Sequence, residues 1–164
     1  MKLILYLNIM QKIQKIKKYN FIYYILLLVS CNNVKDKMKV NDFNYQAVFK
    51  RANYYYDNRN FIKAISSLDS LIAVDSLNGE LFFKRAYSKS ILPDVISAQN
   101  DYKKAIKFNY RKKSAYLNMG VLFAGMGKCN SAIIYLNECL KIEPTNKKAQ
   151  NMKNACLENS LKGE

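Results

Sequence analysis

The sequence of 164 residues contains no histidine and no tryptophan, and only 12 of its residues are acidic. Histidine is the side chain that most often acts as a general base near neutral pH, and it is also the commonest metal ligand. The spaced motifs CxxC, HExxH and GxSxG are absent, as is a glycine-rich phosphate loop. We find no catalytic constellation, and we therefore expect a protein that is not an enzyme and that binds neither a metal nor a cofactor.

Cysteine is scarce as well, with four residues in the whole chain. Apart from Cys31 there are three, and an odd number cannot form a complete disulfide framework. Cys129 and Cys139 lie ten residues apart on one predicted helix, about 15 Å by helical rise, which is too far for a disulfide. Cys139 and Cys156 could approach each other if the last helix packs on the one before it. We expect all three to face the core as small apolar residues, with their redox state left open.

The segment 1–30 contains five lysines and no acidic residue, and four of these lysines precede an apolar run at 21–29. A helix of that length is too short to span a bilayer core, which needs about 20 residues. A basic segment followed by a short apolar run is instead typical of a secretory signal peptide. We therefore predict a signal peptide at residues 1–30, with Met10 as an alternative start to Met1.

The residues that end this segment, Leu28-Val29-Ser30-Cys31, resemble the lipobox of bacterial lipoproteins. That resemblance implies that the signal peptide is cut before Cys31 and that the Cys31 thiol carries a lipid. The protein would then be a lipid-anchored membrane lipoprotein of the cell envelope, in the inner or the outer membrane. The alternative is an ordinary signal peptide beside an incidental cysteine. Residues 31–44 are polar without a sustained period, and we interpret them as a tether.

Basic residues outnumber acidic ones, with 27 Lys+Arg in the whole chain. Without the five lysines of the predicted signal peptide, residues 31–164 hold 22 Lys+Arg against 12 acids, a net charge of +10. An exported protein seldom meets nucleic acid, so we expect no nucleic-acid partner. The basic runs at 103–104, 111–113 and 147–148 lie near predicted helix ends. They are either solvated cations that favour a helix C-terminus, or groups that attract anionic lipid headgroups or an acidic partner.

The pattern of two amphipathic helices joined by a short turn is found in the stretch SAYLNMGVLFAGMGKCNSAIIYLNECLKIEP. On its first helix, apolar or small residues recur at positions i, i+3, i+4 and i+7, from Tyr116 to Phe123. Two glycines in the sequence GMGK interrupt the helical pattern. A second stripe runs from Ala132 to Leu140 and ends before Pro144. The stretch therefore predicts a helix hairpin.

This pattern recurs twice, in register, at a constant spacing of 34 residues along the chain. The positions at which the two helices of each pair would cross hold small residues: Ala52, Ala64, Ala86, Ala98, Gly120 and Ala132. Two helices pack closely only where a side chain at the crossing is small. The order of aromatic, small and proline positions at this period resembles the tetratricopeptide repeat. Arg59 and Pro93 depart from it, because they stand where repeat 3 has a turn glycine.

The resemblance covers residues 45–146 and implies an all-α fold, a right-handed superhelical stack of three helix-turn-helix repeats at 45–78, 79–112 and 113–146. One hairpin cannot bury its apolar stripe alone, so about three units are needed for a stable stack. Residues 147–161 have apolar positions on one face only, and we predict a capping helix there. The whole repeat domain would extend over residues 45–164.

By the same resemblance, the first helices of the repeats line a concave groove for a protein or peptide. The residues that would line it are Phe49, Asn53, Tyr56, Phe83, Tyr87, Ser90, Leu117, Val121 and Ala124. Their aromatic side chains are either anchors for a partner, with Phe83 largely exposed in the free protein, or part of the packing between helices. Some members of the family grip a peptide's terminal carboxylate with Lys and Asn. Phe49, Lys84 and Ser114 depart from that pattern, so we expect no such clamp.

These features predict a non-enzymatic interaction or scaffold module, exported and held on a bacterial membrane by a lipid at Cys31. Its expected partners are a protein or peptide in the groove and, through the lipid anchor, the membrane. An alternative is a structural or assembly subunit of an envelope membrane complex, since lipoproteins with such repeats include assembly factors. Neither interpretation requires a metal, a cofactor or a nucleic acid.

Overall fold

The computed structural model describes residue 42 and residues 44–162. The chain divides into two compact units, Met1–Gln46 and Ala47–Glu164, and the fold below is that of the second unit. The predicted signal peptide, the proposed lipidation site Cys31 and nearly all of the predicted tether lie outside the described residues. Among the residues that are described, no helix is both long enough and apolar enough to cross a membrane.

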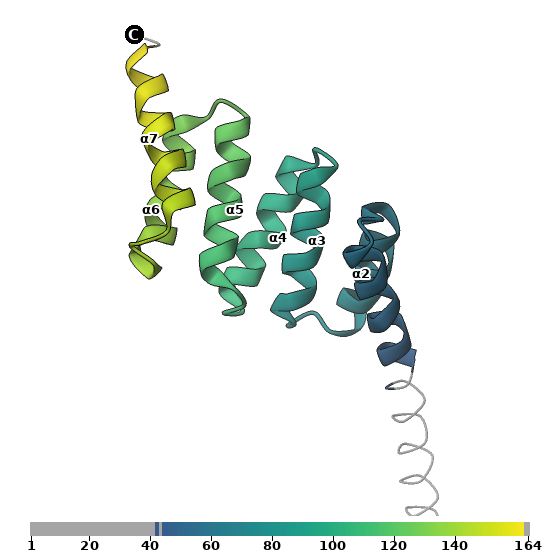
Figure 1. Cartoon of the computed structure of the whole chain (residues 1–164). Helices are drawn as coiled ribbons and strands as arrows, with labels where there is room; N and C mark the ends of the chain where they lie inside the picture. Colours follow the sequence, from purple (N-terminus) through teal and green to yellow (C-terminus); the bar gives the residue numbers. More distant parts are fainter. Residues whose placement is uncertain (1–41, 43, 163–164) are drawn as a thin grey trace, which may run out of the picture. The chain divides into compact units, whose positions relative to one another are not determined.

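Every regular element in the described part of the chain is an α-helix. Residues 44–57 are helical, and six further helices follow: α2 (Phe61–Val74), α3 (Gly79–Ile91), α4 (Val95–Lys107), α5 (Lys112–Gly125), α6 (Cys129–Ile142) and α7 (Lys147–Lys162). Figure 1 shows α2 to α7 stacked in chain order, with consecutive helices antiparallel. The helix pairs and the last helix that we expected from the sequence are therefore present.

Polar side chains at the helix starts explain where three of the helices begin. Side-chain oxygens of Asn60, Asn78 and Asp94 accept hydrogen bonds from backbone amides in the first turns of α2, α3 and α4. These caps satisfy donors that a helix end leaves without an intrahelical partner. Because Asp94 is the cap of α4, Pro93 lies in the turn before the helix, where its missing N–H costs little.

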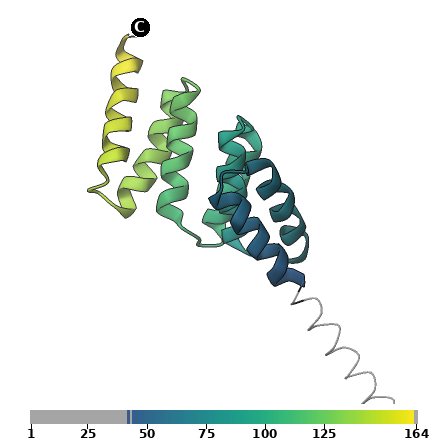
Figure 2. The same cartoon turned by 45° about the vertical axis from the view of Figure 1, so that its right-hand side comes forward.

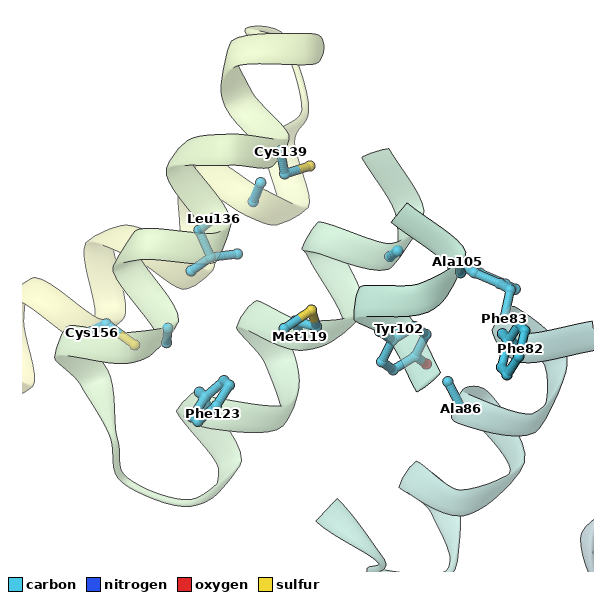
Figure 3. Packing of buried hydrophobic residues seen from close by; sticks show 13 residues of the cluster. Phe82, Phe83, Ala86, Tyr102, Ala105, Met119, Phe123, Leu136, Cys139 and Cys156 are labelled. Carbon is cyan, nitrogen blue, oxygen red and sulfur yellow. The ribbon is translucent and has the colours of Figure 1, made fainter. Parts of the chain in front are cut away.

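Small residues allow the close approach of the two helices in each pair. A Cβ atom added to Gly120 would lie 2.6 Å from the Cδ2 atom of Leu136, so the larger side chain fits only if Leu136 or the helices shift. The alanines at the other crossing positions are at most 1% exposed. Figure 3 shows that the core side chains follow the stack from Phe82 and Phe83 on α3 to Cys156 on α7.

Helix α7 covers the C-terminal end of the stack by packing on α6 and α5. Its Ala149 and Cys156 side chains are buried there. The Cys156 thiol is hydrogen-bonded to the thiol of Cys129, and burial, followed by that bond, raises the pKa of Cys156 to about 11. Figure 3 shows Cys139 at a separate place in the core, so the approach of Cys139 to Cys156 that the sequence allowed does not occur. The reason is that Cys129 begins α6, while Cys139 lies almost three helical turns further along it.

The connections between helices gather on two opposite edges of the stack. The turns within repeats, residues 58–60, 92–94 and 126–128, lie on one edge, which we name the turn edge. The loops between repeats and before α7, residues 75–78, 108–111 and 143–146, lie on the other, the loop edge (Figure 1, Figure 2). The helices α3, α5 and α7 therefore all begin at the loop edge.

Candidate functional site

A hollow of about 540 Å³ lies among α3, α5 and α7, and we name it the α3–α5 groove. Its lining also includes Pro93 in the turn before α4 and Val95, the first residue of α4. The lining residues are Tyr87, Ser90, Ile91, Pro93, Val95, Asn118, Val121, Leu122, Gly125, Met126 and Lys148. Most of them are apolar. Ile91 is 51% exposed and Met126 is 42% exposed, so apolar surface is available to a ligand without any rearrangement.

Two uncharged polar side chains of this groove, Asn118 and Ser90, are hydrogen-bonded to the buried Tyr102 behind it. The Nδ2 atom of Asn118 donates to the Tyr102 hydroxyl at 3.1 Å, and that hydroxyl also shares a hydrogen bond with Ser90. The Ser90 hydroxyl donates to the backbone oxygen of Tyr87 at 2.7 Å. Burial raises the pKa of Tyr102 to about 12, so its hydroxyl is neutral near pH 7. An amide group has two donor hydrogens and an acceptor oxygen, so Asn118 keeps hydrogen-bonding capacity for a ligand.

Charge on the α3–α5 groove is positive and comes from α7. Lys148 is the charged side chain of the lining, and no acidic residue of the described chain lines the hollow. A carboxylate or an oriented carbonyl group of a ligand would therefore meet a favourable potential near Lys148. In the same described part of the chain, no group of three or more His, Cys, Asp or Glu side chains is placed to hold a metal ion.

An aromatic group at the junction of repeats 1 and 2 supports the wall that Tyr87 provides. The Tyr87 ring makes edge-to-face contacts with Tyr56 at 5.7 Å and with Phe61 at 6.0 Å between centroids. Such pairs prefer this geometry and contribute beyond their buried area. Burial, followed by the nearby Tyr87 hydroxyl, raises the pKa of Tyr56 to about 12. Tyr87 is therefore held in place by repeat 1.

Three of the residues that we expected to line a groove do line this one: Tyr87, Ser90 and Val121. Phe49, Asn53 and Tyr56 lie together around another group, the ammonium of Lys84. The Lys84 Nζ atom lies 5.5 Å from the Phe49 ring centroid and 5.8 Å from that of Tyr56, and it donates to the Asn53 side chain. They thus form a second cluster on repeats 1 and 2, and their role in partner binding stays a prediction.

Phe83 is a core residue, so of the two alternatives that the sequence left open for it, the exposed anchor is wrong and packing between helices is what the structure has. Its side chain is 6% exposed, and its ring packs edge-to-face on Tyr102 at 5.7 Å and on Tyr110 at 5.8 Å between centroids. The physical reason is that α3 packs against α2, α4 and α5, so it is buried on more than one face. Leu117 and Ala124 are half-buried and pack against the core in the same way.

The sequence interpretation missed several residues of the α3–α5 groove. Lys148 follows Ser114 by one repeat length, so the repeat spacing, continued into the last helix, would have placed it on the inner surface. Ile91 and Met126 stand at the ends of α3 and α5, beside turns. Exposed apolar residues at those positions were the available signal, because turns normally carry polar side chains.

Helix hairpins of nearly equal length that stack in chain order define an α-helical repeat protein. In this class the stacked first helices form an extended surface that binds other molecules. Residues 114–146 of this chain match the family model described as tetratricopeptide repeat. That match lies in the third hairpin, the one with the full set of aromatic, glycine and proline positions.

Several solved structures are similar to this chain. One is the first TPR of Spaghetti (RPAP3) bound to the HSP90 peptide SRMEEVD, with 23% identity and a TM-score of 0.63 over 70% of this chain and 90% of that one. Another is the second TPR domain of human RPAP3 with the HSP70 peptide SGPTIEEVD, with 25% identity and a TM-score of 0.61 over 66% and 91%. MamA shows 21% identity and a TM-score of 0.68 over 74% and 67%. These similarities confirm the predicted all-α stack of helix-turn-helix repeats.

Proposed function

We propose that this protein is a non-enzymatic protein-binding module that takes a peptide segment of its partner into the α3–α5 groove. The observation that carries the proposal is a ready-made hollow of about 540 Å³ with apolar walls and a few hydrogen-bonding groups. That combination is typical of sites in which apolar side chains provide affinity and polar groups fix orientation. Two of the similar solved structures hold peptides, which supports the same use of the fold here.

The groove suggests what the peptide contributes. An apolar side chain would cover Val121 and Leu122, which are already half-buried in the free protein. The peptide backbone would meet the free hydrogen-bonding capacity of Asn118. A carboxylate of the partner would lie toward Lys148, the cation of the lining. The ligand class is thus a short segment with an apolar residue near an acidic group.

The test uses the full chain to select binders from a displayed peptide library, followed by affinity measurements on variants. Ile91→Ser and Met126→Ser remove apolar surface at the rim of the groove. Each should weaken an enriched peptide about tenfold, since roughly half of a large apolar side chain would be covered on binding. The matched controls are Ile62→Ser and Ile134→Ser, which remove exposed apolar side chains outside the groove. Equal losses in test and control variants, or no enriched peptide at all, would contradict the proposal.

We also propose that the module is exported and anchored to a membrane by a lipid at Cys31. The support is the sequence alone: the basic segment, the short apolar run and Leu-Val-Ser before the cysteine. Metabolic labelling with a clickable fatty acid should mark the wild-type protein and leave Cys31→Ala unlabelled. Equal labelling of both proteins would contradict the lipid anchor at Cys31, and it would leave the peptide-binding proposal unaffected. If the protein instead copurified from membranes in fixed stoichiometry with a membrane protein, it would be an assembly subunit.

A further inference from the structure

The loop edge carries a concentration of cations, of which the peptide-binding groove uses only Lys148. The stretches 107–113 and 141–148 contain seven Lys or Arg residues and a single acidic residue, Glu143, while the third loop of this edge, 75–78, adds Asp75 and no cation. The two basic stretches are neighbours in the fold, because the Lys113 Nζ atom lies 3.1 Å from a Glu143 carboxylate oxygen. A hollow of about 500 Å³ on this edge joins the two stretches. Its lining residues are Asn109, Arg111, Lys112, Lys113, Ser114 and Ile142.

Several of these cations stand at the wrong helix end for stability. Lys112 and Lys113 are in the first turn of α5, and Lys147 and Lys148 are in the first turn of α7; neither turn has an acidic residue. A helix N-terminus carries partial positive charge, so cations there are unfavourable and acids are favourable. Helix α5 also has no side-chain cap. Solvated cations that favour a helix C-terminus, one of the two interpretations open from the sequence, thus do not account for these four.

Intramolecular pairing does not account for them either. Lys113 pairs with Glu143, but no carboxylate of the described residues forms an ion pair with Arg111, Lys112 or Lys147. The Arg111 guanidinium lies over the rings of Tyr110 and Phe83, which leaves its charge unneutralised. Arg111, Lys112 and Lys147 are all exposed. The fold therefore concentrates unneutralised positive charge on one edge, at a cost in helix stability. An external anion would offset that cost.

Exposed aliphatic side chains lie on the same edge. Val74 at the end of α2 is 78% exposed, Leu77 in the loop before α3 is 71% exposed, and Ile142 beside the basic hollow is 51% exposed. Cations interspersed with aliphatic side chains match the boundary of a lipid bilayer, where anionic headgroups meet acyl chains. An acidic protein would neutralise the cations, but it would not explain why the aliphatic side chains of Val74 and Leu77 are exposed on the same edge.

We propose that the loop edge lies against the headgroups of an anionic phospholipid bilayer, with Arg111, Lys112 and Lys147 as its main cations. Val74, Leu77 and Ile142 enter the headgroup boundary. This inference does not rest on the α3–α5 groove or on lipidation of Cys31. If Cys31 does carry a lipid, the basic edge supplies the second signal that a stable anchor needs.

The test measures binding of the full chain with Cys31→Ser to phosphatidylcholine vesicles with and without phosphatidylglycerol. The loop-edge variant combines Arg111→Gln, Lys112→Gln and Lys147→Gln, which removes the three main cations without breaking an ion pair. The control variant combines Arg59→Gln, Lys63→Gln and Lys128→Gln, with the same loss of charge on or beside the turn edge. Each cation near the surface contributes about fivefold to partitioning, so the loop-edge variant should lose roughly a hundredfold.

The control variant should keep most of its binding to the phosphatidylglycerol vesicles, and added salt should reduce the difference between the two variants. Residues 1–30 are common to all the proteins compared, so their contribution cancels. Equal losses in both variants would overturn the proposal, because they would indicate that net charge alone decides binding. Binding that does not depend on phosphatidylglycerol would overturn it as well.

Lysine acetylation of the unsubstituted chain provides a second measurement that needs no stable variant. Vesicles containing phosphatidylglycerol should protect Lys112 and Lys147 from acetylation while Lys63 and Lys128 remain reactive. Protection of all four lysines to the same degree would contradict the orientation. Protection of Lys112 and Lys147 by soluble polyglutamate but not by the vesicles would also overturn the proposal, and it would point to an acidic protein.

Discussion

Repeats 2 and 3 have the same arrangement of two crossing helices. At equivalent interior positions, however, repeat 2 has charged side chains and repeat 3 has apolar or aromatic ones. Both have small residues where their helices cross, Ala86 and Ala98 in repeat 2 and Gly120 and Ala132 in repeat 3. Beside those crossings, repeat 2 has the charged residues Arg85, Lys89 and Asp101. One repeat length further on, repeat 3 has Met119, Phe123 and Tyr135 in their place.

In repeat 2 these positions form a network of ion pairs. Asp101 is 3% exposed, and its carboxylate accepts from Arg85 Nη2 at 2.6 Å, from Arg85 Nε at 2.8 Å and from Lys89 Nζ at 3.0 Å. Arg85 reaches further, to Asp69 on α2, with an Nη1 to Oδ1 distance of 2.6 Å. The bidentate pair with Arg85 is the strong form of this interaction.

In repeat 3 the corresponding positions are filled by packing. The rings of Phe123 and Tyr135 stack with their centroids 5.3 Å apart, and Met119 is fully buried. The repeat frame thus constrains the size of the residues at the crossing but not the polarity of those beside it. The condition is that buried polar groups find partners, and no buried side-chain nitrogen or oxygen of the described residues lacks a hydrogen bond.

The largest expected effect comes from breaking the charged network on one side. Asp101→Ala leaves Lys89 without its carboxylate and Arg85 with only the exposed Asp69. Removal of one partner of a buried ion pair costs about 3–5 kcal/mol, because the remaining charge stays desolvated. Urea unfolding followed by circular dichroism measures this loss. A loss below about 1 kcal/mol would show that the network is hydrated and contributes little.

Exchanging all three members of the network in repeat 2, and leaving only the exposed Asp69, should recover that loss of stability. The combined variant Arg85→Met, Lys89→Phe and Asp101→Tyr gives repeat 2 the interior residues of repeat 3. Replacement of a complete buried ion-pair network by packed apolar residues is often neutral or stabilising by about 1–4 kcal/mol. We expect the combined variant to be at least as stable as wild type in the same urea titration. If it were as unstable as Asp101→Ala, repeat 2 could not accommodate the interior residues of repeat 3, and the two repeats would not be equivalent.

Alkaline pH should lower the free energy of unfolding through Tyr102 in repeat 2, by a smaller amount than Asp101→Ala does. Tyr102 in repeat 2 corresponds to Leu136 in repeat 3, and burial raises the pKa of Tyr102 from 10.0 to about 12. Because the unfolded chain releases this proton near pH 10 and the folded one does not, the contribution of Tyr102 is fully present below pH 10 and is lost as pH rises to about 12. The loss amounts to roughly 2–3 kcal/mol.

The variant Tyr102→Phe cannot ionise at this position and serves as the comparison. Its free energy of unfolding should fall less steeply above pH 10 than that of wild type. Tyr56, whose pKa is also raised to about 12, contributes equally to both proteins. Parallel curves for the two proteins would mean that Tyr102 is accessible to hydroxide in the folded state.

The smallest expected effect concerns the point at which α5 and α6 cross in repeat 3. Gly120→Ala places a Cβ atom 2.6 Å from Leu136 Cδ2, and we expect a loss of about 1–3 kcal/mol from overpacking. The matched control is Gly125→Ala on the same helix, where an added Cβ meets nothing within 4 Å. That change should be neutral or stabilise by up to about 1 kcal/mol through helix propensity. Thermal unfolding of the pair tests whether repeat 3 packs more closely than repeat 2, where Ala86 is accommodated.

The sequence was a good guide wherever one repeat contained the whole signal. The crossing positions, the turn at Gly127 and the last helix were readable because each depends on spacing within a single repeat length. Phe83 was misjudged because its environment comes from three helices at once. The sequence also offered no reason to pair Cys156 with Cys129 and not with Cys139, because that choice depends on how far along α6 the last helix packs.

By itself, the sequence determined that the chain forms helix hairpins and that they stack in register. Helix periodicity, small residues at crossings and polar caps act over a few residues, so their spacing is sufficient. Only the tertiary structure decided that Lys148 joins α3 and α5 in one groove and that Asp101 is buried between Arg85 and Lys89. It also brought the cations of two distant loops to one edge. These arrangements depend on distances between helices, within repeat 2 for Asp101 and between repeats for the groove and the loop edge. Such distances are set by how bulky side chains interlock and not by their positions along the chain.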